Sequence, residues 1–213
     1  MVQAKTKPIL NIWTIATWSE FLDLVEDPAH AKAKVYYFDG LMKVETMGVG
    51  PAHASDNSIL HIALTLFCAL KGIPLKGLVN ASFRQPGAKE AQPDLSYYLG
   101  ERVAFAPKGS SIANLDEGPG PDLAVEIADS SLGDDLGRKR LLYEALGIPE
   151  YWVVDVGAAE IVAFAIADGG SRRIAVSQVL PGLGLSVLEA ALEMARQQDD
   201  SQVTSWLMQQ FQG

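Results

Sequence analysis

Two short stretches of the chain carry acidic residues at positions from which they could hold a metal ion. The segments AQPDLSYYLG (91–100) and GPDLAVEIAD (120–129) each place Pro-Asp-Leu before an apolar, strand-like run. Pro and Asp also mark turns, so the start of a strand explains either pair by itself. Glu126, however, follows within the second run, where a buried carboxylate is costly unless it is paired, protonated or bound to a cation. The pattern makes Asp94 and Glu126 candidate ligands of one divalent cation.

Side-chain alternation leaves room for a ligand beside Glu126. In a strand, Glu126 shares its face with the small residues Ala124 and Ala128. If the two strands pair, we expect Asp94 to approach Glu126, and carboxylate oxygens with water form the usual shell of Mg²⁺. Asp122 stands four residues before Glu126 and is the weaker candidate for a metal ligand. The alternative for Glu126 is a structural pairing with an arginine or a place at the solvated end of the sheet.

A lysine in the next predicted helix is a candidate basic group. The apolar stripe of the helix expected over 132–146 consists of Leu132, Leu136, Tyr143 and Leu146. Lys139 falls in the middle of this stripe, where it needs an anionic partner, and Glu126 is the obvious one. The alternative is a side chain whose stem packs while its ammonium reaches water. Asp129, Asp134 and Asp135 are expected to be loop and helix-start carboxylates.

The other elements predict a sheet covered by helices. Helices are expected over 17–27, 55–71 and 132–146, with one or two more between 185 and 213. Strands are expected over 77–85, 92–100, 121–129 and 150–156, and as hairpins that turn at Asp39-Gly40 and Gly169-Gly170. The core order of helix, three strands, helix and strand predicts an α/β fold. We expect one domain over 1–184 and an amphipathic helical extension over 185–213.

The composition favours a globular protein of the cytoplasm. The 213 residues are 48% hydrophobic and 20% charged, which suits a chain with a sizeable core. The 26 acidic and 17 basic residues give a net charge of −9, which weighs against a protein that coats nucleic acid but not against a nuclease whose carboxylates hold a cation. Cys68 is the only cysteine and is expected to be a buried thiol. We expect no secretory leader and no membrane span, since apolar runs stay below about 18 residues.

The quoted motifs resemble those of the family of unknown function 820, described as restriction-endonuclease-like, within the PD-(D/E)-x-K nuclease superfamily. The resemblance extends from the first hairpin to about Gly184 and rests on QPDL (92–95), PDLAVEI (121–127) and, most specifically, DDLGRKRLLYEALGIPEYWVVD (134–155). It implies the restriction-endonuclease-like core, with Asp94 as the aspartate of the motif and Glu126 as its second acid. Ala128 stands where the simple pattern has a lysine, and Lys139 is then the lysine that has moved to the following helix.

The same resemblance implies a further acidic residue or histidine near the first hairpin and helix. Glu45 in MKVETMG and His53 in GPAHASDN are the candidates, although an exposed hairpin position and a turn before a helix explain them equally well. The predicted activity is hydrolysis of phosphodiester bonds, with DNA as the expected partner. Mg²⁺ or Mn²⁺ would be held by Asp94, Glu126 and the carbonyl of Ile127. Lys139 would orient the attacking water or stabilise charge on the phosphate.

The alternative function is a module that keeps the nuclease fold and acts in binding or assembly without efficient catalysis. The acidic net charge and Ala128 favour this alternative. So do the C-terminal helices, whose apolar side chains could contact a partner: Leu188, Ala191, Leu192, Trp206, Leu207 and Phe211. For the nuclease, the resemblance makes a homodimer plausible, since nucleases with this fold often cut two strands as pairs.

Overall fold

The chain folds into two mixed α/β units, which confirms the predicted fold class. The computed structural model describes residues 9–30, 33–45 and 48–212. The first unit contains the described residues of Met1–Gly48, Ser82–Gln92 and Ser111–Gly118. The second unit contains Val49–Ala81, Pro93–Ser110 and the described residues of Pro119–Gly213. The domain division at residue 184 stays a prediction.

The first unit is a mixed sheet with one helix packed on it. Its strand order is β1-β3-β2-β6-β5-β8. The strands are β1 (Thr14–Ile15), β2 (Lys34–Phe38), β3 (Leu41–Glu45), β5 (Phe83–Gln85), β6 (Lys89–Ala91) and β8 (Ala113–Asn114). Helix α1 (Trp18–Val25) begins with the predicted capping box, in which the Thr17 hydroxyl accepts from the Glu20 amide and the Glu20 carboxylate accepts from the Thr17 amide. A short 3-10 helix, η1 (Pro28–His30), follows it.

The hairpin of β2 and β3 turns where the sequence predicts. Asp39 and Gly40 have φ angles of 53° and 70°. Two successive residues in the left-handed region form the turn whose twist matches the flanking strands, and Asp-Gly is a favoured pair for it. Phe38 and Leu41 therefore pair directly, which sets the register of the whole hairpin.

The second unit contains a six-stranded sheet in the order β12-β11-β10-β9-β7-β4. Its strands are β4 (Leu75–Val79), β7 (Leu95–Leu99), β9 (Leu123–Ala128), β10 (Glu150–Asp155), β11 (Glu160–Ala167) and β12 (Gly170–Ile174). Strands β9 and β10 are parallel, and their neighbours in this sheet are antiparallel. The chain returns from β9 to β10 through α3 (Leu132–Asp134), the π-helical turn η3 (Asp135–Lys139) and α4 (Arg140–Ala145). A short 3-10 helix, η2 (Gly100–Phe105), follows β7.

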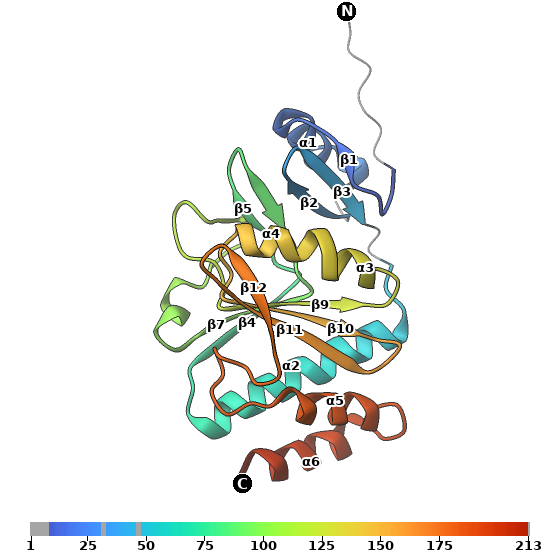
Figure 1. Cartoon of the computed structure of the whole chain (residues 1–213), viewed down its shortest axis with the longest axis vertical. Coiled ribbons are helices and arrows are strands. Elements are labelled where there is room, and N and C mark those ends of the chain that lie inside the picture. The colour runs from blue at the N-terminus through green and yellow to red at the C-terminus, as the bar shows by residue number, and fades with distance from the viewer. Residues whose placement is uncertain (1–8, 31–32, 46–47, 213) are drawn as a thin grey trace, which may run out of the picture. The chain divides into compact units, whose positions relative to one another are not determined.

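Helices cover the two faces of this sheet in different ways. Helices α2 (Pro51–Lys71), α5 (Leu185–Met194) and α6 (Asp200–Gln212) lie on one side of β9 and β10, and α3 and α4 lie on the other (Figure 1). The first side is a continuous apolar core that includes Leu123, Val125 and Ile127 of β9. Cys68 is buried in this core as predicted, and burial raises the pKa of its thiol to about 11.

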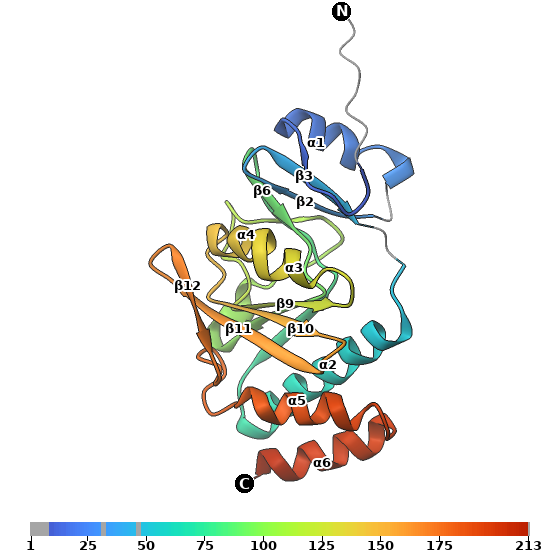
Figure 2. The same ribbon diagram turned by 45° about the vertical axis from the view of Figure 1, so that its right-hand side comes forward.

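The C-terminal helices contribute to the core of the second unit. Helices α5 and α6 pack against each other and against α2 (Figure 2). The six apolar side chains expected to face a partner are instead core residues: Leu188, Ala191, Leu192, Leu207 and Phe211 are buried, and Trp206 packs against them. That part of the prediction is wrong, because the apolar faces of these helices are already covered. Arg196 extends the attachment by pairing with both carboxylate oxygens of Asp56 in α2.

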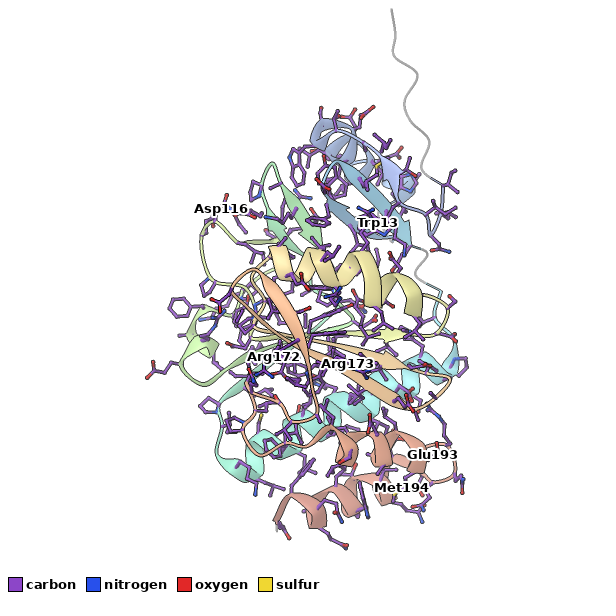
Figure 3. All side chains as sticks on the ribbon, in the orientation of Figure 1. Trp13, Asp116, Arg172, Arg173, Glu193 and Met194 are labelled. Atoms are coloured by element: carbon purple, nitrogen blue, oxygen red, sulfur yellow. The ribbon has the colours of Figure 1, made fainter. Side chains whose placement is uncertain are left out.

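Charged side chains mark the β12 edge of the sheet. Arg172 and Arg173 are consecutive residues of β12, and both are exposed (Figure 3). Strand β12 ends the strand order, with β11 as its neighbour there. Charged residues on such an edge disfavour pairing with the sheet of another molecule. No helix in the described part of the chain is long and apolar enough to cross a membrane.

Several boundaries differ from the prediction. The run expected as one strand over 77–85 forms β4 and β5 in different sheets, because Asn80 between them has a φ of 53°. Helix α2 begins at Pro51, four residues before the expected start. The second hairpin turns at Asp168 and Gly169, one residue earlier than expected. The expected loop over 101–120 includes η2 and β8, and the helix expected over 132–146 contains the π turn.

Candidate active site

The pairing of β7 with β9 brings the two predicted acids together. Leu95 pairs with Val125 and Ser96 with Ala124. Continuing this antiparallel register by one residue places Asp94 opposite Glu126. Directly opposite residues of paired strands project from the same face of a sheet. Both carboxylates are buried, at 4% and 2% exposure, on the face that α3 and α4 cover.

Hydrogen bonds fix the carboxylate of Asp94 at the start of its strand. Its Oδ2 accepts from the backbone amide of Ile127 at 2.8 Å. Its Oδ1 lies 3.4 Å from Nε2 of His53, whose side chain is 13% exposed. His53 belongs to the first turn of α2, which is longer than expected, so this histidine is a helix residue rather than a residue of the preceding turn.

The backbone of Ile127 is also directed toward Asp94. In a strand, the amide and the carbonyl of one residue point to the same edge, as the exchanged bonds of antiparallel pairs require. Since the Ile127 amide donates to Asp94, the Ile127 carbonyl faces the Asp94 side of β9 as well. The side chain of Ile127 points the other way, into the apolar core. Ile127 thus contributes its backbone to the Asp94 side of β9 and its side chain to the core.

Two groups from the crossover helix contact Glu126. The hydroxyl of Tyr143 donates to Glu126 Oε1 at 2.7 Å. Nζ of Lys139 lies 3.7 Å from the same oxygen. Lys139 is 1% exposed, so the predicted pairing with Glu126 describes it better than a side chain that reaches water. The flanking Ala124 and Ala128 are fully buried, which leaves this face of β9 to the carboxylate.

Lys139 forms an ion pair with Asp135, which is not among the candidate site residues predicted from the sequence. Asp135 Oδ1 lies 2.9 Å from Lys139 Nζ, and Asp135 is 1% exposed. Asp135 was expected to be a loop or helix-start carboxylate, and it does lie near the start of the helical segment, but buried. Its position four residues before Lys139, on the same side of a helix, was the available signal. The two residues begin and end the π turn η3. Such turns are rare in proteins, and those that occur often lie at functional sites.

Two stacked tyrosines complete this buried network. The rings of Tyr143 and Tyr151 are 4.5 Å apart and inclined by 23°. The Tyr151 hydroxyl donates to the backbone carbonyl of Asp135 at 3.0 Å. Burial raises the pKa of both tyrosines well above the usual value, and the charges of Glu126 and Asp135 raise it further. Both phenols therefore keep their protons and act as hydrogen-bond donors.

The other predicted acids lie elsewhere. Glu45 ends β3 in the first unit, where its Oε1 lies 2.7 Å from Nζ of Lys43. Its role at the site stays a prediction. Asp122 accepts from the Leu99 amide at 2.8 Å and lies 2.9 Å from Arg102 Nε. Burial raises the pKa of Asp122, while the Leu99 amide and Arg102 lower it. Through its bond to Leu99, this carboxylate joins the residue before β9 to the end of β7.

The oxygen atoms present suit a hard cation that keeps part of its water shell. Across the described ranges 9–30, 33–45 and 48–212, no three His, Cys, Asp or Glu side chains form a ready ligand group. Asp94 and Glu126 offer two carboxylates, and the Ile127 carbonyl faces the same edge. Mg²⁺ is usually bound by one or two carboxylates with several waters, whereas a structural zinc site needs four protein ligands. The residues therefore fit Mg²⁺ or Mn²⁺.

Comparison with known proteins adds a family to this geometry. A family model named Uma2, "Putative restriction endonuclease", matches residues 18–197. The chain belongs to the Uma2 family. The resemblance predicted from the PD motifs is thereby confirmed. No curated protein matches the sequence.

One solved structure shares the Uma2 fold seen here. It is the crystal structure of "a putative nuclease belonging to DUF820" from Anabaena variabilis ATCC 29413. The TM-score is 0.56, and the likeness covers 90% of this chain and 98% of that one at 16% sequence identity. At this identity the likeness shows the fold, and the chemistry must be argued from the residues described above.

Proposed function

We propose that this Uma2 protein is a metal-dependent nuclease that hydrolyses phosphodiester bonds of DNA. The observation that carries the proposal is the placement of Asp94 opposite Glu126 on neighbouring strands, with the ammonium of Lys139 3.7 Å from Glu126. Two acids that could hold a cation and a lysine that supplies positive charge suit the hydrolysis of a phosphodiester. The family description supports the reaction class.

Asp94, Glu126 and the carbonyl of Ile127 are the groups that would hold Mg²⁺ or Mn²⁺. When bound, such a cation lowers the pKa of a coordinated water and neutralises charge that develops on the phosphate. The Ile127 amide holds Asp94 in place, and the Tyr143 hydroxyl holds Glu126. Because these bonds exist before any ligand arrives, both carboxylates can be oriented without large rearrangement.

Lys139 supplies the positive charge that the chain itself brings to the reaction. Its ammonium can donate to the attacking water or to a phosphate oxygen as negative charge develops there. Its burial places this charge in surroundings of low dielectric, where it acts more strongly than in water. His53, next to Asp94, would orient that carboxylate or donate to the substrate. Glu45 is proposed as an additional acid of the reaction.

The substrate and surroundings belong to the same proposal. DNA is the proposed substrate, a homodimer the proposed assembly and the cytoplasm the proposed location. Acidic net charge does not oppose a DNA substrate, because a divalent cation held by two carboxylates would neutralise their charge at the site of cleavage. The buried thiol of Cys68 needs no oxidising compartment.

A second function is favoured by one specific observation. Ala128 occupies the position at which the simple nuclease pattern has its lysine, and Ala128 is fully buried. If Lys139 does not replace the missing lysine, the chain would keep the fold without efficient catalysis. It would then act in binding or assembly.

Titration calorimetry with Mn²⁺ and Mg²⁺, combined with cleavage of linear and supercoiled DNA, tests the proposal. The wild-type protein should bind a cation and cleave DNA only in its presence. Glu126→Gln keeps the size of the side chain and should weaken both, whereas Glu160→Gln, which removes an exposed glutamate of β11, should change neither. Parallel assays with single-stranded RNA identify the substrate. Absence of cation binding in a well-folded dimer would favour the assembly function instead.

A further inference from the structure

Asp135 is a buried acid to which the proposed reaction assigns no task. Its carboxylate is 1% exposed and forms an ion pair with Lys139 at 2.9 Å. The distance from the same ammonium to Glu126 is 3.7 Å. Lys139 is therefore held chiefly by Asp135, although the sequence favours Glu126 as its partner. This difference matters, because Glu126 is also the proposed cation ligand.

Several bonds keep Asp135 from moving. Its Oδ2 accepts from the hydroxyl of Ser131, one helical turn earlier. Its backbone carbonyl accepts from Tyr151 of β10 at 3.0 Å, and Tyr151 is fully buried. The side chain and the backbone of Asp135 are thus anchored independently, one to the helix and one to the sheet. A fixed Asp135 is a fixed attachment point for the lysine.

Charge balance shows why such an attachment point is needed. Among the described residues of this site, the carboxylates of Asp94, Glu126 and Asp135 outnumber the single ammonium of Lys139. Without Asp135, the ammonium of Lys139 would move closer to Glu126, whose Oε1 lies 3.7 Å away. The ammonium would then compete with a cation for Glu126, because two positive charges beside one buried carboxylate repel each other strongly.

We infer that Asp135 is a positioning residue that holds the Lys139 ammonium beside Glu126 and thereby keeps Glu126 available to the cation. The inference rests on the proposed function for the cation. Its geometry comes from the distances of Lys139 to Asp135 and to Glu126 and of Tyr151 to the Asp135 carbonyl. Asp135 acts through Lys139 and is not a ligand itself. Substitution of Asp135 should therefore change the metal affinity only while Lys139 is present.

A double-mutant cycle on Mn²⁺ affinity, measured by titration calorimetry, tests this dependence. Asp135→Asn in the wild type should weaken Mn²⁺ binding by about tenfold or more, as expected for a group that supports a metal ligand. The same substitution in the Lys139→Ala background should change the affinity by less than about threefold, because no ammonium remains to be held. Equal effects in the two backgrounds would overturn the inference, since Asp135 would then act by its own charge or as a ligand.

Two further variants guard against a loss of folding and an unspecific charge effect. Asp135→Glu keeps the carboxylate and should restore most of the Mn²⁺ affinity that Asp135→Asn loses. Asp129→Asn removes an exposed acid just after β9 and should have little effect. If Asp129→Asn weakens binding as much as Asp135→Asn, the effect is one of net charge and the inference fails.

An NMR signal separates failure of this inference from failure of the proposed function. The ammonium of Lys139, assigned with Lys139→Ala, should give a slowly exchanging signal because it is buried in an ion pair. Asp135→Asn should shift or remove this signal in metal-free protein. A signal that Asp135→Asn leaves unchanged overturns the inference. A wild-type protein that shows the signal and binds no cation overturns the proposed function and the cation part of the inference, while the attachment of Lys139 to Asp135 stands.

Discussion

At both ends of the β7–β9 ladder, an aspartate carboxylate accepts a backbone amide of the neighbouring strand, but the two aspartates differ in their surroundings. At one end, Asp94 precedes β7 and accepts the amide of Ile127 on β9 at 2.8 Å. At the other end, Asp122 precedes β9 and accepts the amide of Leu99 on β7, also at 2.8 Å. Each Pro-Asp pair thus supplies a carboxylate in place of the backbone carbonyl that the ladder lacks at its end. This structural task is enough to explain why the motif occurs twice.

The difference between the ends lies in the residue across the ladder. The register places Glu126 opposite Asp94 and Tyr98 opposite Asp122. The second oxygen of Asp122 is neutralised by Arg102, whose side chain is 37% exposed, whereas Asp94 faces a second buried acid. The comparison teaches that an aspartate at the start of a strand is structural by default. Its chemistry depends on what the neighbouring strand places opposite to it.

The largest expected effect separates the two aspartates directly. In Asp94→Asn and Asp122→Asn, the amide oxygen can still accept the backbone amide, so both proteins should fold. Asp94→Asn should reduce metal-dependent cleavage by more than about a hundredfold, the upper range for a group that only supports a ligand. Asp122→Asn should leave the rate per folded molecule unchanged and lower stability by less than about 1 kcal/mol, as for a partly exposed ion pair. Equal loss of cleavage in both variants would contradict the assignment.

A smaller effect is expected when the support of Glu126 is removed. Tyr143→Phe keeps the stacked ring and removes the hydroxyl that donates to the buried carboxylate. Loss of a hydrogen bond to a charged group should lower the free energy of unfolding by about 1.5–3 kcal/mol. Tyr151→Phe is the matched control, because its hydroxyl donates to a neutral carbonyl and its loss should cost about 0.5–1.5 kcal/mol. Urea unfolding of both variants measures the difference, and a larger loss in Tyr151→Phe would contradict it.

The smallest effect concerns the middle of β7, between the two ends. Nδ1 of His61 lies 3.2 Å from the hydroxyl of Tyr97, and burial lowers the pKa of His61 below its usual value of 6.5. The unfolded chain therefore takes up this proton more readily, and stability should fall as the pH decreases from above 6.5 toward the lowered pKa. His61→Asn should remove this decrease, as followed by thermal unfolding across that range. His30→Asn, in the first unit, should leave it in place.

The sequence predicts the fold well where a specific local motif or a regular alternation determines an element. The capping box at Thr17, the Asp39-Gly40 turn and the alternation in β9 all appear in the structure as expected. The exception is the run over 77–85, whose composition is strand-like throughout. A single left-handed residue, Asn80, divides it between two sheets, and asparagine tolerates that conformation without any change in the apolar pattern.

The candidate site is only partly visible in the sequence, for a physical reason. Asp94, Glu126 and Lys139 are recognisable because each is a charged residue in an apolar context. Asp135 escapes this criterion, since an acid near a helix start is ordinary. The Tyr143 hydroxyl escapes it too, because an aromatic residue on an apolar stripe is expected to pack rather than to donate. Only the folded arrangement shows which carboxylate the lysine and the phenol contact.

The π turn between Asp135 and Lys139 has a consequence that substitutions alone do not reveal. A π turn joins residues five apart where an α-helix joins residues four apart, so this segment contains one more residue than an uninterrupted α-helix of the same number of turns. Deleting Gly137 would remove that extra residue, so Asp135 and Tyr143 would keep their relative faces on the helix, while the separation of Asp135 and Lys139 would fall from four residues to three. The π turn thus places one residue more between these two ionic partners than a regular helix of the same number of turns would, and a deletion here should disturb their ion pair before it disturbs the fold.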